Sequence, residues 1–119
     1  MPLFQAEGWQ TYTPTVAAVT GTITTLGTCT GRWIRRGKLI ICTGQIVITT
    51  NGTGATALDI GLPVAAASGS VLSGFNPSGP FPFAGSIGPG GSAATCYKPD
   101  GTYPGGSGHT LRFYASYEG

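Results

Sequence analysis

An apolar or small residue stands at every second position from residue 40 to residue 48, and this period of two constrains the fold more than any other feature of the chain. A period of two is that of an extended strand with one buried face, and β-branched residues favour the strand conformation. The side chains of that face are Ile40, Cys42, Gly44, Ile46 and Ile48. No segment of ten or more residues repeats apolar residues at the helical spacing of three and four. The sequence therefore predicts an all-β fold.

A first hairpin is predicted from residues 28–36 and 38–50, with Arg36 and Gly37 at its turn. In this register Trp33 lies opposite Ile40 and Gly31 lies opposite Cys42. A shift by one residue would move the whole apolar set to the other face. We therefore expect Cys29, Gly31 and Trp33 to join the core face.

A second hairpin is predicted where the strand ends in Asn51 and Gly52. A three-residue loop over 52–54, with Gly in the left-handed conformation, is a common hairpin connection. It would place an alternating strand beside Ile46 and Ile48, and Pro63 would end that strand because proline cannot donate to a ladder. The apolar residues of this strand are Leu58, Ile60 and Leu62.

Shorter strands are predicted on either side of these hairpins, and two Gly- and Pro-rich loops separate the later ones. Pro14 interrupts the first strand, which favours an edge position. The expected strands cover residues 11–19, 21–26, 71–72, 93–97 and 109–117, and the loops cover residues 74–91 and 98–108. We predict an antiparallel β-sandwich, jelly-roll-like, as a single domain over residues 1–119. Residues 1–8 are expected to form an N-terminal connector.

Charged residues make up only 8% of the chain, against about 25% in ordinary globular domains. The face of the first hairpin opposite the core is also apolar, with Ile34, Leu39, Ile41 and Val47. An apolar second face needs a cover. Either a neighbouring protomer or another loop of the same chain could supply it, and the sparse charge leads us to expect a homotrimer.

Several classes of partner are not expected. The basic cluster of Arg32, Arg35, Arg36 and Lys38 fits a solvated hairpin tip better than a nucleic-acid site, because binding to a duplex uses many phosphate contacts. No apolar run is long enough to cross a membrane, and no secretory signal segment opens the chain. We expect synthesis in the cytoplasm and release by another route, such as lysis.

Catalytic and metal-binding residues are too few to form a site. The acids Glu7, Asp59, Asp100 and Glu118 are scattered, and His109 is the only histidine, so neither a catalytic triad nor a carboxylate pair is predicted. The three cysteines lie in strand-like segments without zinc spacing, so free thiols are expected at Cys29, Cys42 and Cys96. No enzyme activity, metal or other cofactor is predicted.

A ligand-binding site is predicted at the second loop. Aromatic faces stack on sugar rings, and polar groups beside them fix the orientation of hydroxyl groups. Loops held on a rigid scaffold commonly carry binding residues. The predicted ligand-binding residues are Tyr97, Asp100, Tyr103 and His109, and Tyr103 is expected to be exposed. The phenylalanines of the first loop, Phe81 and Phe83, are expected to fill the end of the core instead.

Four segments together resemble the terminal, receptor-binding domain of bacteriophage and prophage tail fibres. They are residues 9–16 (WQTYTPTV), 21–24 (GTIT), 31–38 (GRWIRRGK) and 46–63 (IVITTNGTGATALDIGLP), and residues 110–118 (TLRFYASYE) resemble the closing strand of that family. Residues 75–108 match no pattern of the family.

The resemblance implies a trimeric tip in the virion, joined to an upstream fibre shaft or to a tail or capsid protein. Its divergent loops would touch a host-surface polysaccharide or another cell-surface receptor. A different class remains open, in which the domain is a structural trimerisation, capping or capsid decoration module that binds no receptor.

Overall fold

The computed structural model describes residues 8–119, so Glu7 and all but Gly8 of the expected connector lie outside the described residues. Within that range the regular elements are ten strands, and no helix that could span a membrane is found. The strands are β1 (Gln10–Tyr12), β2 (Val16–Thr20), β3 (Thr25–Leu26), β4 (Thr30–Arg36), β5 (Leu39–Thr50), β6 (Ala55–Gly61), β7 (Ser70–Asn76), β8 (Phe81–Ile87), β9 (Ala93–Tyr97) and β10 (His109–Glu118).

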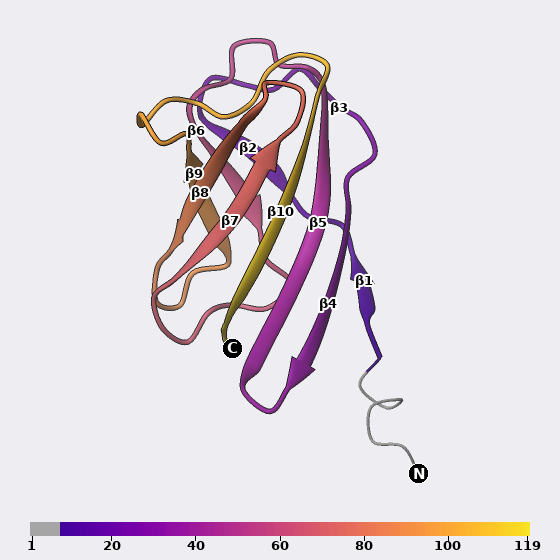
Figure 1. The fold of residues 1–119 in the computed structure, drawn as a ribbon, viewed down its shortest axis with the longest axis vertical. Coiled ribbons are helices and arrows are strands. Elements are labelled where there is room, and N and C mark those ends of the chain that lie inside the picture. Colours follow the sequence, from indigo (N-terminus) through magenta and orange to yellow (C-terminus); the bar gives the residue numbers. More distant parts are fainter. Residues whose placement is uncertain (1–7) are drawn as a thin grey trace.

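All ten strands belong to one antiparallel sheet that curls into a half-barrel (Figure 1). The order along the sheet is β1-β4-β5-β10-β7-β8-β9-β6-β2, and β3 also pairs with β5. The predicted all-β antiparallel class is therefore confirmed. The expected division into the two sheets of a sandwich is not confirmed, since hydrogen bonds run through the whole order.

The first strands connect the two edges of the curled sheet. β1 pairs with β4 at one edge, whereas β2 pairs with β6 at the other, and β3 then returns to β5. The crossing between β1 and β2 is held because the Tyr12 hydroxyl donates to the Gly61 carbonyl at 3.2 Å. The amide of Gly61 in turn donates to the Thr15 carbonyl at 2.8 Å. As predicted, Pro14 interrupts this segment, and β1 and β2 are edge strands.

The first hairpin forms between β4 and β5, but its register differs from the predicted one by two residues. Trp33 faces Cys42 rather than Ile40, and Gly31 faces Gly44 rather than Cys42. The turn is centred on residues 37–38, where Gly37 has a φ of 61°. Glycine at the first central position suits a tight hairpin turn better than Arg36 would. A shift of two preserves the faces, so Ile40, Cys42, Ile46 and Ile48 are buried as predicted.

The prediction of the second hairpin is wrong. β5 does not pair with β6; ten residues of β10 lie along β5 instead, from His109 opposite Ile48 to Glu118 opposite Leu39. β6 pairs with β2 and β9. The predicted tight turn does form, since the Gly54 amide donates to the Asn51 carbonyl at 3.2 Å. Positive φ values at Gly52 and Thr56 then direct the chain away from β5. The residues of a turn determine only the local path of the chain. The strand that pairs with β5 is decided by the match of apolar side chains along the whole strand.

The predicted loop over residues 74–91 contains a strand. β7 and β8 form a hairpin in which Phe83 and Ile87 are buried. This strand was not predicted because it contains Pro82, and proline is rare inside a sheet. It is tolerated because β8 pairs with β9 only over residues 84–86, so Pro82 lies beyond that pairing. The expectation that a phenylalanine fills the core is confirmed for Phe83.

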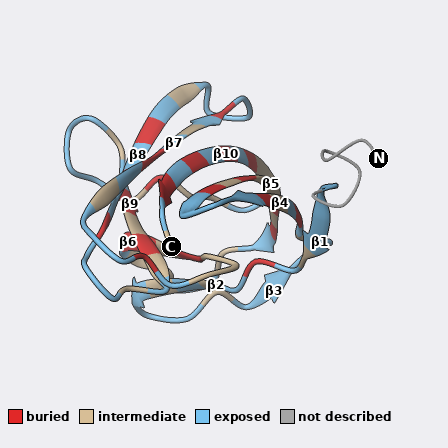
Figure 2. Cartoon of the chain, turned by 90° about the horizontal axis from the view of Figure 1, so that it is seen from below, coloured by how far each residue is buried: buried red, intermediate tan, exposed pale blue. Residues whose placement is uncertain are grey.

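Glycines opposite aromatic rings shape the inside of the curl. A Cβ added to Gly31 would meet the ring of Tyr12, one added to Gly44 would meet Phe113, and Gly74 and Phe83 have the same relationship. Figure 2 shows buried and exposed residues alternating along β10. Its buried side carries Leu111, Phe113, Ala115 and Tyr117. The inner face of the curled sheet is therefore the hydrophobic core.

The outer face of the first hairpin is covered unevenly. Ile34 is only 7% exposed, whereas Leu39 is 45% exposed. Ile41 and Val47 are half-buried. The amide of Gly27, which follows β3, donates to the Val47 carbonyl at 2.8 Å, so a loop of the same chain lies beside part of this face.

Candidate functional site

Tyr103, predicted to be an exposed binding residue, is half-buried and packs against the core. Its hydroxyl donates to Oδ1 of Asn51 at 2.6 Å, and burial raises its pKa. The backbone amide of Asn51 donates to the Ser107 hydroxyl at 2.8 Å, which is a second hydrogen bond between this loop and the turn after β5. The expected exposure of Tyr103 is therefore wrong, because the loop folds back onto the turn after β5.

His109 also takes part in holding this loop. Its Nδ1 lies 2.9 Å from Nδ2 of Asn76, a side chain with no exposed surface. Nδ2 of Asn76 also donates to the Pro104 carbonyl at 2.9 Å, and its Oδ1 accepts from the amides of Ser78 and Gly79. The buried amide thus joins β7 to the end of the loop and to the start of β10.

Asp100 and Tyr97 lie elsewhere, at the start of the loop. Asp100 is fully exposed, and its Oδ1 accepts from the Thr102 amide at 3.0 Å and from the Thr102 hydroxyl. These hydrogen bonds lower its pKa. Tyr97 is 40% exposed at the end of β9. It lines a hollow of about 580 Å³, here called the apolar groove, with Pro82, Phe83, Ala84, Lys98, Pro99 and Gly101.

The four predicted residues therefore form two groups. Tyr97 and the neighbours of Asp100 border the apolar groove, whereas Tyr103 and His109 hold the loop in place. Contact between any of them and a ligand stays a prediction.

A second surface emerges from the strand registers on the outer face of the sheet. Tyr114 of β10 is 50% exposed and Phe75 of β7 is 47% exposed. Two rows of outward side chains cross the sheet there, each following residues paired from strand to strand. The first row is Arg32, Thr43, Tyr114, Ser73, Ala84 and Tyr97, and the second is Thr30, Gln45, Arg112, Phe75 and Pro82. We call these eleven residues the outer patch.

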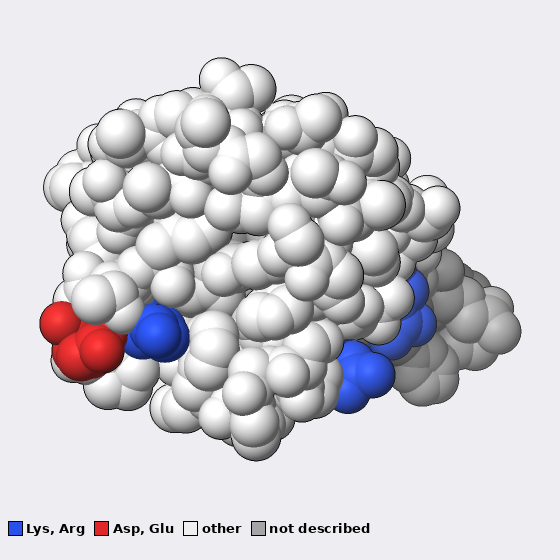
Figure 3. Space-filling view, turned by 90° about the horizontal axis from the view of Figure 1, so that it is seen from above, with Lys and Arg blue, Asp and Glu red and all other residues white. Residues whose placement is uncertain are grey.

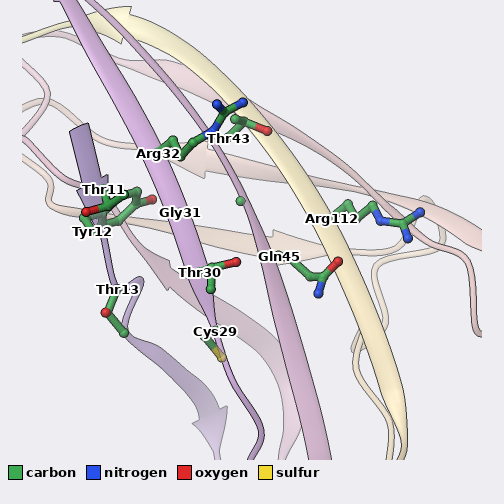
Figure 4. Close-up of a pocket in the computed structure, with 11 residues that line it drawn as sticks. Thr11, Tyr12, Thr13, Cys29, Thr30, Gly31, Arg32, Thr43, Gln45 and Arg112 are labelled. Carbon is green, nitrogen blue, oxygen red and sulfur yellow. The ribbon is translucent and has the colours of Figure 1, made fainter. Parts of the chain in front are cut away.

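The outer patch ends in a hollow at each side. The apolar groove lies at the β8–β9 end. At the β4–β5 end lies a larger hollow of about 750 Å³, here called the arginine groove, which is shown in Figure 4. Its lining residues are Thr11, Tyr12, Thr13, Cys29, Thr30, Gly31, Arg32, Thr43, Gly44, Gln45 and Arg112. The paired glycines Gly31 and Gly44 contribute only backbone atoms to this lining, because their missing side chains would point to the inner face, toward the rings of Tyr12 and Phe113.

Electrostatics distinguish the two hollows. The arginine groove has two guanidinium groups, four threonines and one glutamine in its lining, and no carboxylate. Arg32 lies over the ring of Trp9, with 5.0 Å from its Cζ to the ring centroid. Figure 3 shows how sparse charge is on the face that it views. Among residues 8–119 no group of three metal-ligating side chains is found.

Arg32 and Arg112 were not predicted from the sequence as site residues. Arg32 was assigned to a solvated hairpin tip, and Arg112 had no predicted role. A usable signal was present in 109–117, since Leu111, Phe113, Ala115 and Tyr117 share one face and therefore leave Arg112 and Tyr114 on the other. No feature of the sequence indicated that β10 pairs with β5, and it is this pairing that brings Arg112 beside Gln45.

Comparisons with protein-family models, with curated proteins and with solved structures returned no match to this chain. The resemblance to phage fibre tips therefore rests on the segments quoted above.

Proposed function

We propose that this chain is the receptor-binding tip domain of a phage or phage-like tail fibre and that it attaches to a host-surface glycan. The observation that carries the proposal is the group of three exposed rings on the outer patch, formed by Tyr114, Phe75 and Tyr97. An exposed ring offers a flat apolar face to the C–H groups of a sugar, and tyrosine adds a polar hydroxyl. The rings stand on strands β10, β7 and β9 of one sheet, so little conformational entropy is lost when a ligand binds.

The location in a virion follows from the resemblance. The segments that carry it belong largely to β1, β4, β5 and β6, which form part of the scaffold. In the proposed particle the chain is made in the host cytoplasm and assembles as a homotrimer on an upstream fibre shaft or on a tail or capsid protein. Three sites that engage one surface together would raise the apparent affinity without new contacts.

Attachment to host cells tests this proposal. Tyr114→Ala should reduce attachment at least about tenfold, since stacking is lost at the centre of the patch, a loss of the order measured for other aromatic anchors. Thermal stability should be nearly unchanged because half of the Tyr114 side chain is exposed on the outer face. Val19→Ala is the matched control, since Val19 is also 50% exposed but lies on the distant strand β2. Equal attachment by both variants would count against the proposal.

A structural module is the second candidate, and exposed aliphatic residues favour it. Val71 is 66% exposed and Leu39 is 45% exposed, both on the outer face. Contact with another protein would remove such surface from water. A module of this kind would assemble with the particle and bind no glycan. Absence of host-cell attachment by the wild-type chain, together with loss of assembly after Val71→Asp, supports it over the first proposal.

A further inference from the structure

The arginine groove contains two cations that the described chain does not neutralise. No ion pair of Arg32 or Arg112 is recorded among residues 8–119; Arg32 makes the cation–π contact with Trp9. Of the described acids, Asp59 accepts from the Thr95 hydroxyl at 2.8 Å and Asp100 accepts from Thr102. Glu118 lies on β10 six residues beyond Arg112, about 20 Å along an extended strand. Within residues 8–119 the positive charge of the groove is therefore uncompensated.

The two guanidinium groups are set apart rather than converging. β4 and β10 are separated by β5, and Arg112 lies two residues along β10 from the partner of Thr43, which itself faces Arg32. Strand spacing and rise then give about 12 Å between the two Cα atoms. Figure 4 shows Arg32 beside Thr43, and Arg112 beyond Gln45. This arrangement suits an extended ligand with more than one polar contact.

The remaining lining selects among anionic ligands. Threonine hydroxyls and the Gln45 amide both donate and accept hydrogen bonds, as sugar hydroxyls do, whereas a phosphate needs donors alone. Tyr114 follows Arg112 on the same outward side of β10, so a sugar ring stacked on Tyr114 brings its substituents beside a guanidinium. Arginine binds a carboxylate through two parallel hydrogen bonds.

We propose that the arginine groove binds the acidic units of a carboxylate-bearing saccharide, with Arg112 and Arg32 as the groups that contact the carboxylates. This inference rests on the proposed attachment to a glycan and names the class of glycan. It also places the charge-recognition site on the outer face of β4, β5 and β10, away from the loop over residues 98–108.

An array of bacterial surface polysaccharides tests this inference. The array carries three groups, which are uronate- or sialate-bearing, phosphate-bearing and neutral polysaccharides. The wild-type chain should bind the first group, and binding should weaken as salt is added because salt screens exposed charges. Reduction of the carboxyl groups of a bound polysaccharide to alcohols should abolish its binding, because that treatment removes the charge and keeps the sugar chain.

Variants identify the groups responsible. Arg112→Gln and Arg32→Gln should each weaken binding to the acidic polysaccharides by about 10- to 100-fold, the usual range for a lost hydrogen bond to a charged group. Arg112→Lys should keep part of the affinity, because it retains the charge and loses the paired hydrogen bonds. Lys38→Gln is the control, since it removes the same charge at the exposed hairpin turn. Thermal unfolding of each variant checks that the fold is retained.

The outcomes separate this inference from the proposal on which it rests. Wild-type binding to neutral polysaccharides alone, or to phosphate-bearing ones alone, overturns the inference and leaves glycan attachment standing. Unchanged acidic binding by both arginine variants also overturns it. If no polysaccharide of any group is bound while the chain still attaches to host cells, both the inference and the choice of a glycan as receptor are wrong.

Discussion

The ring of Phe113 lies over Gly44 on the neighbouring strand, so that a Cβ added to Gly44 would be 2.6 Å from Cζ of Phe113. Tyr12 and Phe83 have the same relationship with Gly31 and Gly74. Each glycine makes room for a large ring inside the curl, and the paired strands can then approach without a void. Large and small residues that alternate across facing positions pack a concave core well.

Gly44→Ala should therefore lower the free energy of unfolding by about 1–3 kcal/mol, the usual cost of overpacking a core. The carbonyl of Thr30, also 2.6 Å from the added Cβ, is a backbone group and cannot move away as the end of a flexible side chain could. Urea denaturation measures the change. Gly88→Ala is the control, because a Cβ there meets nothing within 4 Å. A loss of stability in the control equal to that of Gly44→Ala would contradict the explanation.

Tyr103→Phe should destabilise the chain by about 1 kcal/mol, because it removes the hydrogen bond to Asn51 and keeps the ring. Tyr114→Phe serves as the control, since the exposed hydroxyl of Tyr114 has no recorded partner in the described chain. Chemical denaturation of both variants gives the comparison. Equal stability of Tyr103→Phe and wild type would show that the loop is not held by this contact.

The three thiols should react in a fixed order, and all three are unpaired as predicted. Cys42 and Cys96 are fully buried, and burial raises their pKa to about 11 and about 12. Because the thiolate is the reactive form, iodoacetamide at pH 8 should modify only half-buried Cys29 in the folded chain. Mass spectrometry should find three modified thiols after unfolding. Modification of Cys42 or Cys96 before unfolding would contradict the burial of these residues.

The same two thiols should make stability fall in alkaline solution. Each keeps its proton in the folded chain up to a higher pH than in the unfolded chain, where the pKa is about 8.5. Stability is thus fully present below pH 8.5 and is lost as the pH rises toward 11 or 12, by up to about 1.4 kcal/mol per pH unit for each thiol. Urea denaturation between pH 7 and 10 checks this. Cys96→Ala should reduce the slope, and an unchanged slope would exclude Cys96 as a cause.

Light scattering at micromolar concentration should give a mass three times the 12.0 kDa of one chain. Leu39→Asp should convert this trimer into folded monomers, because a charge in a dry interface is costly. Leu39 is 45% exposed in the single chain, so the monomer itself should tolerate the change. Ile41 on the same face is half-buried, so Ile41→Asp combines dissociation with unfolding. A stable monomer of the wild-type chain would refute the trimer.

The sequence by itself determined the all-β class and the inward face of β5. Alternation is a local property, so it placed Ile40, Cys42, Ile46 and Ile48 in the core, and Pro14 marked an edge. The predicted core residues remained correct although the register of the first hairpin was wrong, because a shift of two residues keeps every side chain on its face.

Only the tertiary structure decided which strands pair and what lies on the outer face. The turn over residues 51–54 has the glycines of a hairpin, yet β10 occupies the position beside β5, because the partner of a strand depends on long-range packing and not on its own turn. That pairing brings Arg112 beside Gln45 and diagonally across β5 from Arg32, and so creates the arginine groove. The fold of the last loop likewise buries part of Tyr103, through a contact with Asn51 that lies 52 residues earlier in the chain.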